Sequence, residues 1–561
     1  MRTTNSSTSS RRITSFMVRK SGPSDPSNLM GNSARAIVHL RAQRHRKRLG
    51  LIFGAGASKA LGFPGWEDLV NRIARHEAVQ AEDVLSRAGE IKPPRSLAAL
   101  THMMFDHFRA RKLSGAGLDT SVPLLQEQRI KSDWLRIIHS ELYRDVPKAA
   151  DDRKKSIEAH PYLKSFLDVV KASPLTVNYN FDDTIEKLLM FSRNEEEEST
   201  TRGYETIDKP NAQFQKPAGV IYHPNGFLPS RFDDGASADL VFDSDGFQDQ
   251  LISAANGRYV HLSNHLSRNT CLLIGLSLDD TTLQSMLRQN AVASPGHIHY
   301  FVHFVGTDTS LSDETRKAVF DSNFTSYNLY TLFLDADGIR HLADLIRMPD
   351  SQFVRFQPNS RKLVYYVVGS IGAGKSTAAS NFRSLITYDE WIDERLPELA
   401  RPQSAEDDAS SIDSWIAEQF RKKNYALNEC KEGIHLVDRC PLDPLTFPGD
   451  KQAKAANLLA TMTHENAMTI AQGHVIMLDC DLDELKHRNS LKHKYWEDDK
   501  LSSLINEIDL VYRDVPKTVL CTRGRSIDEV AREIARIIFL AEYTPVDIGA
   551  ELQKHCEAVC A

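Results

Sequence analysis

A glycine-rich segment at 369–376, Gly-Ser-Ile-Gly-Ala-Gly-Lys-Ser, most constrains how this chain folds, because it fits the pattern GxxxxGK[ST] completely. It follows the apolar run Leu-Val-Tyr-Tyr-Val-Val at 363–368 and precedes a stretch with helical character at 377–382. In such a strand–loop–helix unit, backbone N–H groups surround phosphate oxygens, and the helix N-terminus adds a favourable potential. The segment therefore predicts a phosphate-binding α/β domain in the C-terminal third of the chain.

The residues of this segment have distinct expected contacts with a nucleotide. Gly369, Gly372 and Gly374 let the backbone curl closely around the phosphate groups. Lys375 is expected to reach the β- and γ-phosphates of ATP, and the Ser376 hydroxyl to ligate Mg²⁺. The other residues of the expected nucleotide-binding set are Thr377, Asp438, Arg439 and Arg488.

Charged residues at the ends of later apolar runs are candidates for phosphoryl-transfer chemistry. Asp389 or Glu390 lies where a base can accept the proton of an acceptor hydroxyl, although an acidic helix cap explains this pair nearly as well. Asp438 and Arg439 end a second run, where a carboxylate supports Mg²⁺ and an arginine holds a phosphate. Arg488 lies in a basic stretch that suits a lid, although any single lysine there is expected to be solvated.

These features together resemble the P-loop kinases of nucleosides and nucleotides, the deoxynucleoside and thymidylate kinase group. The resemblance covers roughly 360–540, and only its glycine-rich phosphate loop is highly specific. It implies a doubly wound sheet and ATP with Mg²⁺ as the phosphoryl donor. It does not identify the acceptor.

A second candidate site begins with Gly-Ala-Gly-Ala-Ser at 54–58, directly after an apolar run. Alone, this turn is weak evidence for a nucleotide site. Three later runs, at 175–186, 220–229 and 271–280, also pass from apolar to small or polar residues. Because the carboxyl ends of parallel strands meet in one crevice of an open α/β sheet, the four segments predict one ligand site.

The four segments resemble the sirtuin superfamily, in particular its bacterial NAD-consuming branch, over roughly 47–345. The matching residues are Gly-Ala-Gly-Ala-Ser with Pro64 and Trp66, Asn-Phe-Asp-Asp at 180–183 with Glu186, His-Pro-Asn-Gly at 223–226, and Gly-Leu-Ser-Leu-Asp-Asp at 275–280. The resemblance implies NAD⁺ as the substrate.

The resemblance also implies a role for each matching position. Asn180 and Asp182 would hold the nicotinamide ribose and an attacking water, and an alternative register gives the asparagine role to Asn178. Gly275 and Ser277 would face the adenosine side. The residues expected to cradle the pyrophosphate are Gly54, Ala55, Gly56 and Ser58.

Two departures from the sirtuin pattern change the expected activity. The four-cysteine zinc module of sirtuin deacylases is missing, since this segment contains only Cys271, so we expect no zinc and favour NAD⁺ hydrolysis over deacylation. The usual His-Gly pair reads Asn225-Gly226, which leaves Asn225 as a cofactor-binding residue. His223, two residues earlier on the same strand face, either binds ribose hydroxyls or accepts a proton, or else is structural.

The pattern of runs along the chain predicts the fold class α/β, with two doubly wound parallel-sheet domains separated by a polar stretch at 346–361. The basic cluster at 41–48 can touch phosphates, but charge runs of this kind are usually solvated. The expected order is a disordered basic tail at 1–36, a sirtuin-like NAD-binding domain at 37–350 with a helical insertion at about 67–170, a P-loop kinase-like domain at 360–545, and a C-terminal tail at 546–561.

Composition adds little to the functional argument. The formal net charge of −6 gives no reason to expect nucleic acid or a membrane surface as a partner, and the absence of long apolar runs favours a cytoplasmic protein. The leading hypothesis is an NAD⁺ hydrolase gated by a nucleotide-sensing or phosphorylating domain. This combination resembles bacterial antiphage systems, which implies a phage-derived trigger and a possible homo-oligomer.

Two further classes of function stay open. In the first, the kinase is the working enzyme, a metabolic nucleoside or nucleotide kinase, and NAD or ADP-ribose regulates it from an inactive sirtuin-like domain. In the second, both halves are nucleotide-binding switches without turnover. Protein deacetylation ranks lowest because the zinc cysteines are missing.

Overall fold

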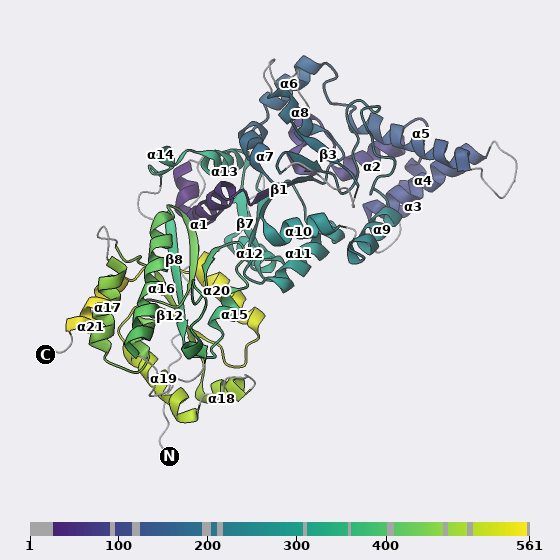
Figure 1. Ribbon diagram of the computed structural model, residues 1–561. Helices are drawn as coiled ribbons and strands as arrows, with labels where there is room; N and C mark the ends of the chain where they lie inside the picture. The colour runs from purple at the N-terminus through teal and green to yellow at the C-terminus, as the bar shows by residue number, and fades with distance from the viewer. Residues whose placement is uncertain are drawn as a thin grey trace.

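The structure is a computed structural model with two parallel β-sheets, each flanked by helices (Figure 1). Among the described residues, no helix is both long and apolar enough to cross a membrane. The described residues are 26–89, 96–114, 124–192, 203–209, 217–257, 259–306, 311–356, 361–400, 409–463, 469–490 and 497–557.

The first sheet has seven parallel strands in the order β3-β4-β2-β1-β5-β6-β7. After β1 the chain crosses toward β2, and after β5 it crosses toward β6, so the crossover direction reverses between the neighbouring strands β1 and β5. The strands are β1 (Leu49–Phe53), β2 (Thr176–Asn178), β3 (Glu205–Ile207), β4 (Val220–Tyr222), β5 (Thr270–Ile274), β6 (His299–Phe304) and β7 (Leu329–Leu334).

A long helical excursion separates β1 from β2, and its α4 and α5 extend away from the second sheet (Figure 1). The excursion contains α2 (Trp66–Arg75), α3 (Glu82–Gly89), α4 (Leu97–Leu113), α5 (Leu124–Leu142), α6 (Ala150–Glu158) and α7 (Leu167–Ala172). The other helices of this half are α8 (Thr184–Phe191), α9 (Ser244–Ala255), α10 (Val260–Arg268), α11 (Thr281–Ala293), α12 (Asp313–Tyr327), α13 (Ala336–Arg347) and α14 (Asp350–Phe353).

The second sheet has five parallel strands in the order β12-β11-β8-β10-β9. Its strands are β8 (Lys362–Gly369), β9 (Ile386–Tyr388), β10 (Gly433–Asp438), β11 (His474–Asp479) and β12 (Lys517–Cys521). Its helices are α15 (Lys375–Ala379), α16 (Ala409–Glu429), α17 (Lys451–Thr463), α18 (Leu482–Ser490), α19 (Asp498–Val511), α20 (Ile527–Phe539) and α21 (Ile548–Glu557). Two parallel sheets with flanking helices confirm the predicted fold class.

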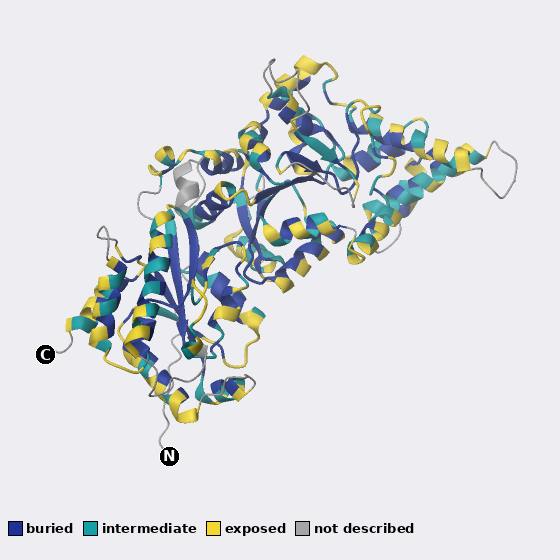
Figure 2. Cartoon of the chain, viewed as in Figure 1, coloured by how far each residue is buried: buried dark blue, intermediate teal, exposed yellow. Residues whose placement is uncertain are grey.

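The central strand β8 is buried on both faces from Leu363 to Gly369 and is dark blue in Figure 2. Alternate side chains enter different cores: Leu363 and Tyr365 join the cluster that also contains the core of the first half, whereas Val364 and Tyr366 join a second cluster. This alternation explains why the run is apolar at consecutive positions. One hydrophobic core is therefore continuous between the two halves.

The helix α1 (Pro26–His45) lies between the two halves and corrects the predicted boundary of the N-terminal tail. The tail was expected to reach residue 36, yet residues 26–36 are helical; residues 1–25 lie outside the described residues. α1 packs on α13 and against β10. Ile37 and Leu40, three residues apart on one helix face, are fully buried there, so their burial offsets the cost of ordering this segment.

The predicted C-terminal tail at 546–561 is also corrected in its described part. Val546 pairs with Gly473 in an isolated antiparallel bridge, and α21 packs on α17. The reason is that Ile548 and Leu552, four residues apart, point the same way and are fully buried. Residues 558–561 lie outside the described residues.

We expect Leu552→Ala to lower the free energy of unfolding by about 2–5 kcal/mol, because it removes a fully buried side chain and leaves a cavity. Urea unfolding followed by circular dichroism measures this loss. The exposed neighbour Gln553 provides the control, since Gln553→Ala is expected to change stability by less than about 0.5 kcal/mol. Equal stability of the two variants would show that α21 does not dock in this way.

Candidate functional site

The first candidate site lies at the carboxyl ends of β1 and β5, where the crossover direction reverses. Ligands of open α/β sheets bind in the crevice at such a point. Gly54 follows β1, and Gly275 follows β5 with a φ of 73°. A Cβ on Gly56 would lie 2.9 Å from the Gly275 Cα, so the two turns approach more closely than larger residues allow.

The turn after β1 uses most of its backbone donors internally. The amides of Gly54 and Gly56 donate to the carbonyls of Ile274 and Gly275, each at 2.9 Å, and the Ser58 amide donates to Ala55. The Ala55 amide has no acceptor among the described residues, and Ala55 and Gly56 are exposed. The predicted pyrophosphate cradle therefore offers one backbone N–H in this conformation, together with an accessible glycine edge.

Asn180, which follows β2, is held directly against this turn. Its side-chain amide donates to the Gly54 carbonyl and to the Ser58 hydroxyl, both at 3.0 Å. Asn178, the alternative register, is buried in β2, and its side chain accepts a hydrogen bond from the Asn180 amide. The structure thus brings Asn180, and not Asn178, to the Gly54 turn.

The two aspartates after Asn180 have different environments. Asp182 is buried and accepts a hydrogen bond from the Thr184 amide at 2.9 Å, and burial raises the pKa of its carboxyl. Burial also disfavours the charge of Asp183, but Arg153 and Ser230 hold the pKa of that carboxyl below its usual value. Asp182 therefore keeps a weakly acidic carboxyl near Asn180, whereas Asp183 ties α6 to the sheet.

His223 is fully buried and has a partner on each ring nitrogen. Nδ1 lies 2.9 Å from the Asn180 carbonyl, and Nε2 lies 2.8 Å from the Glu186 carboxylate. Both partners are acceptors, so both nitrogens carry hydrogens. Although burial opposes the charge, Glu186 outweighs it and raises the pKa of His223.

This geometry favours the structural alternative for His223 over ribose binding or proton acceptance. An imidazolium with both N–H groups engaged neither accepts a proton nor contacts ribose hydroxyls. Its contact with the Asn180 backbone instead makes it a positioning residue. Sequence reasoning identified the histidine and Glu186 separately but carried no signal that they pair.

The two other predicted residues at this edge also have defined places. Asn225 is buried, and its side chain accepts a hydrogen bond from Gln250 at 3.0 Å and donates to the Tyr179 carbonyl at 3.4 Å. Asn225 is thus held in the core by Gln250 and Tyr179. Ser277 is exposed on the loop after Gly275.

The second candidate site is the phosphate loop after β8. Gly369, Gly372 and Gly374 have φ values of 143°, 93° and 99°, which only glycine adopts readily. Lys375 folds back onto this loop, where its ammonium donates to the carbonyls of Gly369 at 2.9 Å and Ser370 at 3.1 Å. Burial lowers the pKa of Lys375 to about 8.

A hydroxyl and a carboxylate are paired beside the loop. The Ser376 hydroxyl donates to Asp438 Oδ2 at 2.5 Å. Asp438 is the last residue of β10, so it lies at the same edge of the sheet as the loop. Asp438 Oδ1 is buried without a hydrogen-bond partner among the described residues. A hydroxyl and an orphaned carboxylate oxygen are hard oxygen donors, so the residues present fit Mg²⁺. Thr377 is exposed in the first turn of α15.

The structure distinguishes the two predicted acidic candidates after β9. Asp389, the predicted catalytic residue, is exposed, whereas Glu390 accepts two hydrogen bonds from the Arg439 guanidinium, at 2.8 and 2.6 Å. Arg439 also lies 3.5 Å from Asp443 and has a φ of 72°. Glu390, rather than Asp389, therefore belongs to the charged cluster beside the phosphate loop, because the chain turns after Tyr388.

Sequence reasoning missed Lys423 of α16. Its ammonium donates to the carbonyls of Glu390 and Asp438, both at 2.8 Å, and burial lowers its pKa to about 8. It thereby fixes the ends of β9 and β10 against each other. A lysine within an amphipathic helix gives no sequence signal of this role.

Arg488, on α18, contacts the phosphate loop. It donates to the Ala373 carbonyl at 3.4 Å and to the Thr522 carbonyl at 3.1 Å, and it pairs with Glu484. The part of the predicted basic stretch at 491–496 lies outside the described residues, whereas Lys486 of α18 pairs with Asp498 at 3.0 Å.

Comparison with known families supports the first site. Residues 174–331 match the family described as SIR2-like domain. The matched range contains Asn180, Asp182, His223, Asn225 and Gly275, and begins after the Gly54 turn. No curated protein matches the chain. The sirtuin-like part of the predicted organisation is thus supported, and an NAD-related function fits it.

We expect Glu186→Gln to destabilise the protein by about 3–5 kcal/mol, because the His223 imidazolium then stays buried without its counter-charge. Urea unfolding measures this loss, and nitrogen NMR of histidine follows the protonation of His223. Glu205→Gln, at a partly exposed strand position, is the control and is expected to leave both readouts unchanged. A neutral His223 in the wild type at pH 7 would contradict the assignment.

Proposed function

We propose that the SIR2-like half hydrolyses NAD⁺ to nicotinamide and ADP-ribose, and that nucleotide binding in the P-loop half gates this reaction. The observation that carries the proposal is the contact of the Asn180 side chain with the Gly54–Ser58 turn at the β1/β5 crevice. The match to the SIR2-like family at 174–331, which includes β2 and β5 but not β1, supports NAD⁺ as the substrate.

The proposed reaction breaks the bond between nicotinamide and the ribose and forms a bond from water oxygen to the same ribose carbon, with release of one proton. Such a step depends on positioning and on stabilising charge at the ribose more than on a strong base. Asn180 orients the ribose and the water, and the raised pKa of Asp182 suits it to take the released proton. His223 fixes the Asn180 backbone through its Nδ1 hydrogen bond.

The P-loop half is proposed to bind ATP with Mg²⁺ at the 369–376 loop. Ser376 and Asp438 would hold the metal, which supplies charge neutralisation for the phosphates when bound. Lys375 would exchange its loop carbonyls for phosphate oxygens. Arg439 and Glu390 face the same edge and would orient a nucleotide or nucleoside acceptor.

The gating proposal rests on the segment that leaves the phosphate loop. Helix α15 starts in this loop, and the chain after it reaches Phe382, whose buried ring is so close to Gly296 that a Cβ there would lie 2.6 Å from it. The next turn places the Ser384 carbonyl on His39 of α1, at 3.0 Å. A shift of α15 on nucleotide binding would thus reach the first half through packed atoms.

Such an arrangement suits a defence protein in which infection triggers NAD⁺ depletion. We propose a bacterial antiphage role with a phage-derived trigger, for a homo-oligomer in the cytoplasm. A resting state with low NAD⁺ turnover follows, because constitutive hydrolysis would be toxic.

A second candidate function is a metabolic nucleoside or nucleotide kinase whose first half only binds NAD or ADP-ribose. Two observations favour it: Asn225 replaces the usual histidine, and His223 is held in an ion pair with Glu186. Under this alternative, phosphorylated product forms while NAD⁺ stays intact.

We expect Asn180→Ala to abolish nicotinamide release, at least about 100-fold, because the ribose-positioning amide is lost. Nicotinamide is quantified with purified protein and NAD⁺, across a panel of nucleosides, deoxynucleotides and ATP–Mg²⁺. Asn256→Ala, at the exposed end of α9, is the control and keeps full activity. Unchanged cleavage by Asn180→Ala would overturn the site.

Lys375→Ala is expected to remove the dependence of nicotinamide release on ATP–Mg²⁺, because the phosphate loop loses its ammonium. The same assay tubes report phosphorylated products, which separates gating from the kinase alternative. Lys500→Ala, on the exposed face of α19, keeps the dependence. Gating that persists in Lys375→Ala would show that the nucleotide acts elsewhere.

A further inference from the structure

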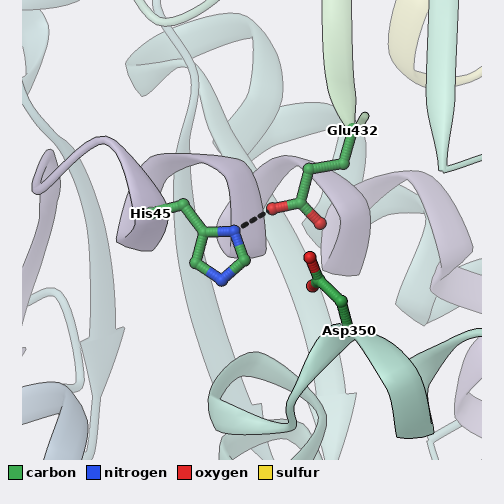
Figure 3. A group of neighbouring side chains, drawn as sticks. All are labelled: His45, Asp350 and Glu432. Carbon is green, nitrogen blue, oxygen red and sulfur yellow. Dashed lines mark ion pairs between the residues drawn. The ribbon is translucent and has the colours of Figure 1, made fainter. Parts of the chain in front are cut away.

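We propose that His45, Asp350 and Glu432 form a binding site for a divalent transition-metal ion at the junction of the two halves (Figure 3). The three residues come from the last turn of α1, from the start of α14 and from the residue before β10. One ligand atom from each lies within 4.8 Å of the others. Nothing in the proposed NAD⁺ or ATP chemistry uses these side chains.

Burial of Glu432 provides the second observation. Its side chain is only 10% exposed, yet both carboxylate oxygens are buried and accept no hydrogen bond from the described residues. Its contacts are ion pairs, with His45 Nδ1 and, at 3.6 Å, with Arg41. His45 and Arg41 offset part of the cost of burying this carboxylate, and its lone pairs without hydrogen bonds remain available to a further cation.

Arg41 orients the Asp350 carboxylate of this site. Its guanidinium donates to one oxygen of Asp350 at 2.8 Å and is itself fixed by two hydrogen bonds to the carbonyls of Leu345 and Met348. Arg41 does not hold the second Asp350 oxygen, and Glu432 Oε1 faces His45, so both oxygens are available to a shared ion. Outer hydrogen bonds of this kind orient metal-binding carboxylates in proteins.

The donor set indicates which ions would bind. One imidazole nitrogen and two carboxylate oxygens suit Zn²⁺, Mn²⁺ and similar first-row ions better than Ca²⁺ or Mg²⁺, which prefer oxygen ligands alone. The side chains of His45 and Asp350 are 39% and 45% exposed, so an ion and its water ligands have access from solvent. Bound metal would clamp α1 and α14 of the first half to β10 of the second.

The test uses the full-length protein, stripped with a chelator and titrated with Zn²⁺ by calorimetry, and with thermal unfolding as a second readout. We expect one Zn²⁺ ion per chain to bind at this site and to raise the temperature at which the protein unfolds. His45→Gln and Asp350→Asn, at partly exposed positions, are expected to fold and to weaken that binding by more than about tenfold.

Asp337→Asn removes an exposed carboxylate from α13 and serves as the matched control, with unchanged Zn²⁺ affinity and unchanged thermal shift. Zn²⁺ binding that is equal in the wild type, His45→Gln and Asp350→Asn would place the ion elsewhere and overturn the proposal. Absence of saturable binding in the wild type would do the same and would leave the three residues as a charged contact between the halves.

Discussion

The two halves depend on one buried charge, the guanidinium of Arg41. This side chain is fully buried, its guanidinium donates to the carbonyls of Leu345 and Met348 and to Asp350, and its Cζ lies 3.9 Å from the centroid of the Phe353 ring. Its Nε forms no hydrogen bond with the described residues but lies 3.6 Å from the Glu432 carboxylate of the second half. A buried arginine is costly without such partners, so these contacts favour one docked position of α1. That position brings α1 against β10 and gives both sheets a common core.

This constraint also explains why the sequence misled at the N-terminus. Residues 41–48 carry a dense basic cluster, which is normally solvated, and the chain before it has little apolar periodicity. The structure buries His39, Arg41 and Gln43 on the helix, each bonded to carbonyls of other segments, and His39 also to Tyr300. Polar residues whose partners are distant backbone groups cannot be distinguished from solvated ones by sequence pattern alone.

The candidate sites were predictable where a motif fixes the backbone and not where tertiary contacts choose between neighbours. The phosphate loop followed from its glycines, and the end of β2 from its apolar run. The choice between Asp389 and Glu390 depends on a turn after Tyr388, and the clamp by Lys423 depends on where α16 lies. The prediction that His223 and Asn225 share a strand face was wrong, because β4 ends at Tyr222 and Asn225 lies in a turn. The pairing of His223 with Glu186 of α8 likewise depends on tertiary contacts.

The positions of the two sites constrain how they can communicate. Both lie at the carboxyl ends of their strands, whereas α1 joins the halves near the amino ends: Gly433 starts β10, and Tyr300 is the second residue of β6. At about 3.3 Å per residue, the length of β8 separates the phosphate loop at its carboxyl end from the α1 contacts at the amino end of the sheet. The path that we propose for coupling runs from α15 through Phe382 to Gly296, where buried atoms are in contact. Because Gly296 has no side chain, the buried Phe382 ring lies against backbone there, so a displacement of α15 that moves Phe382 would press on the backbone of the first half.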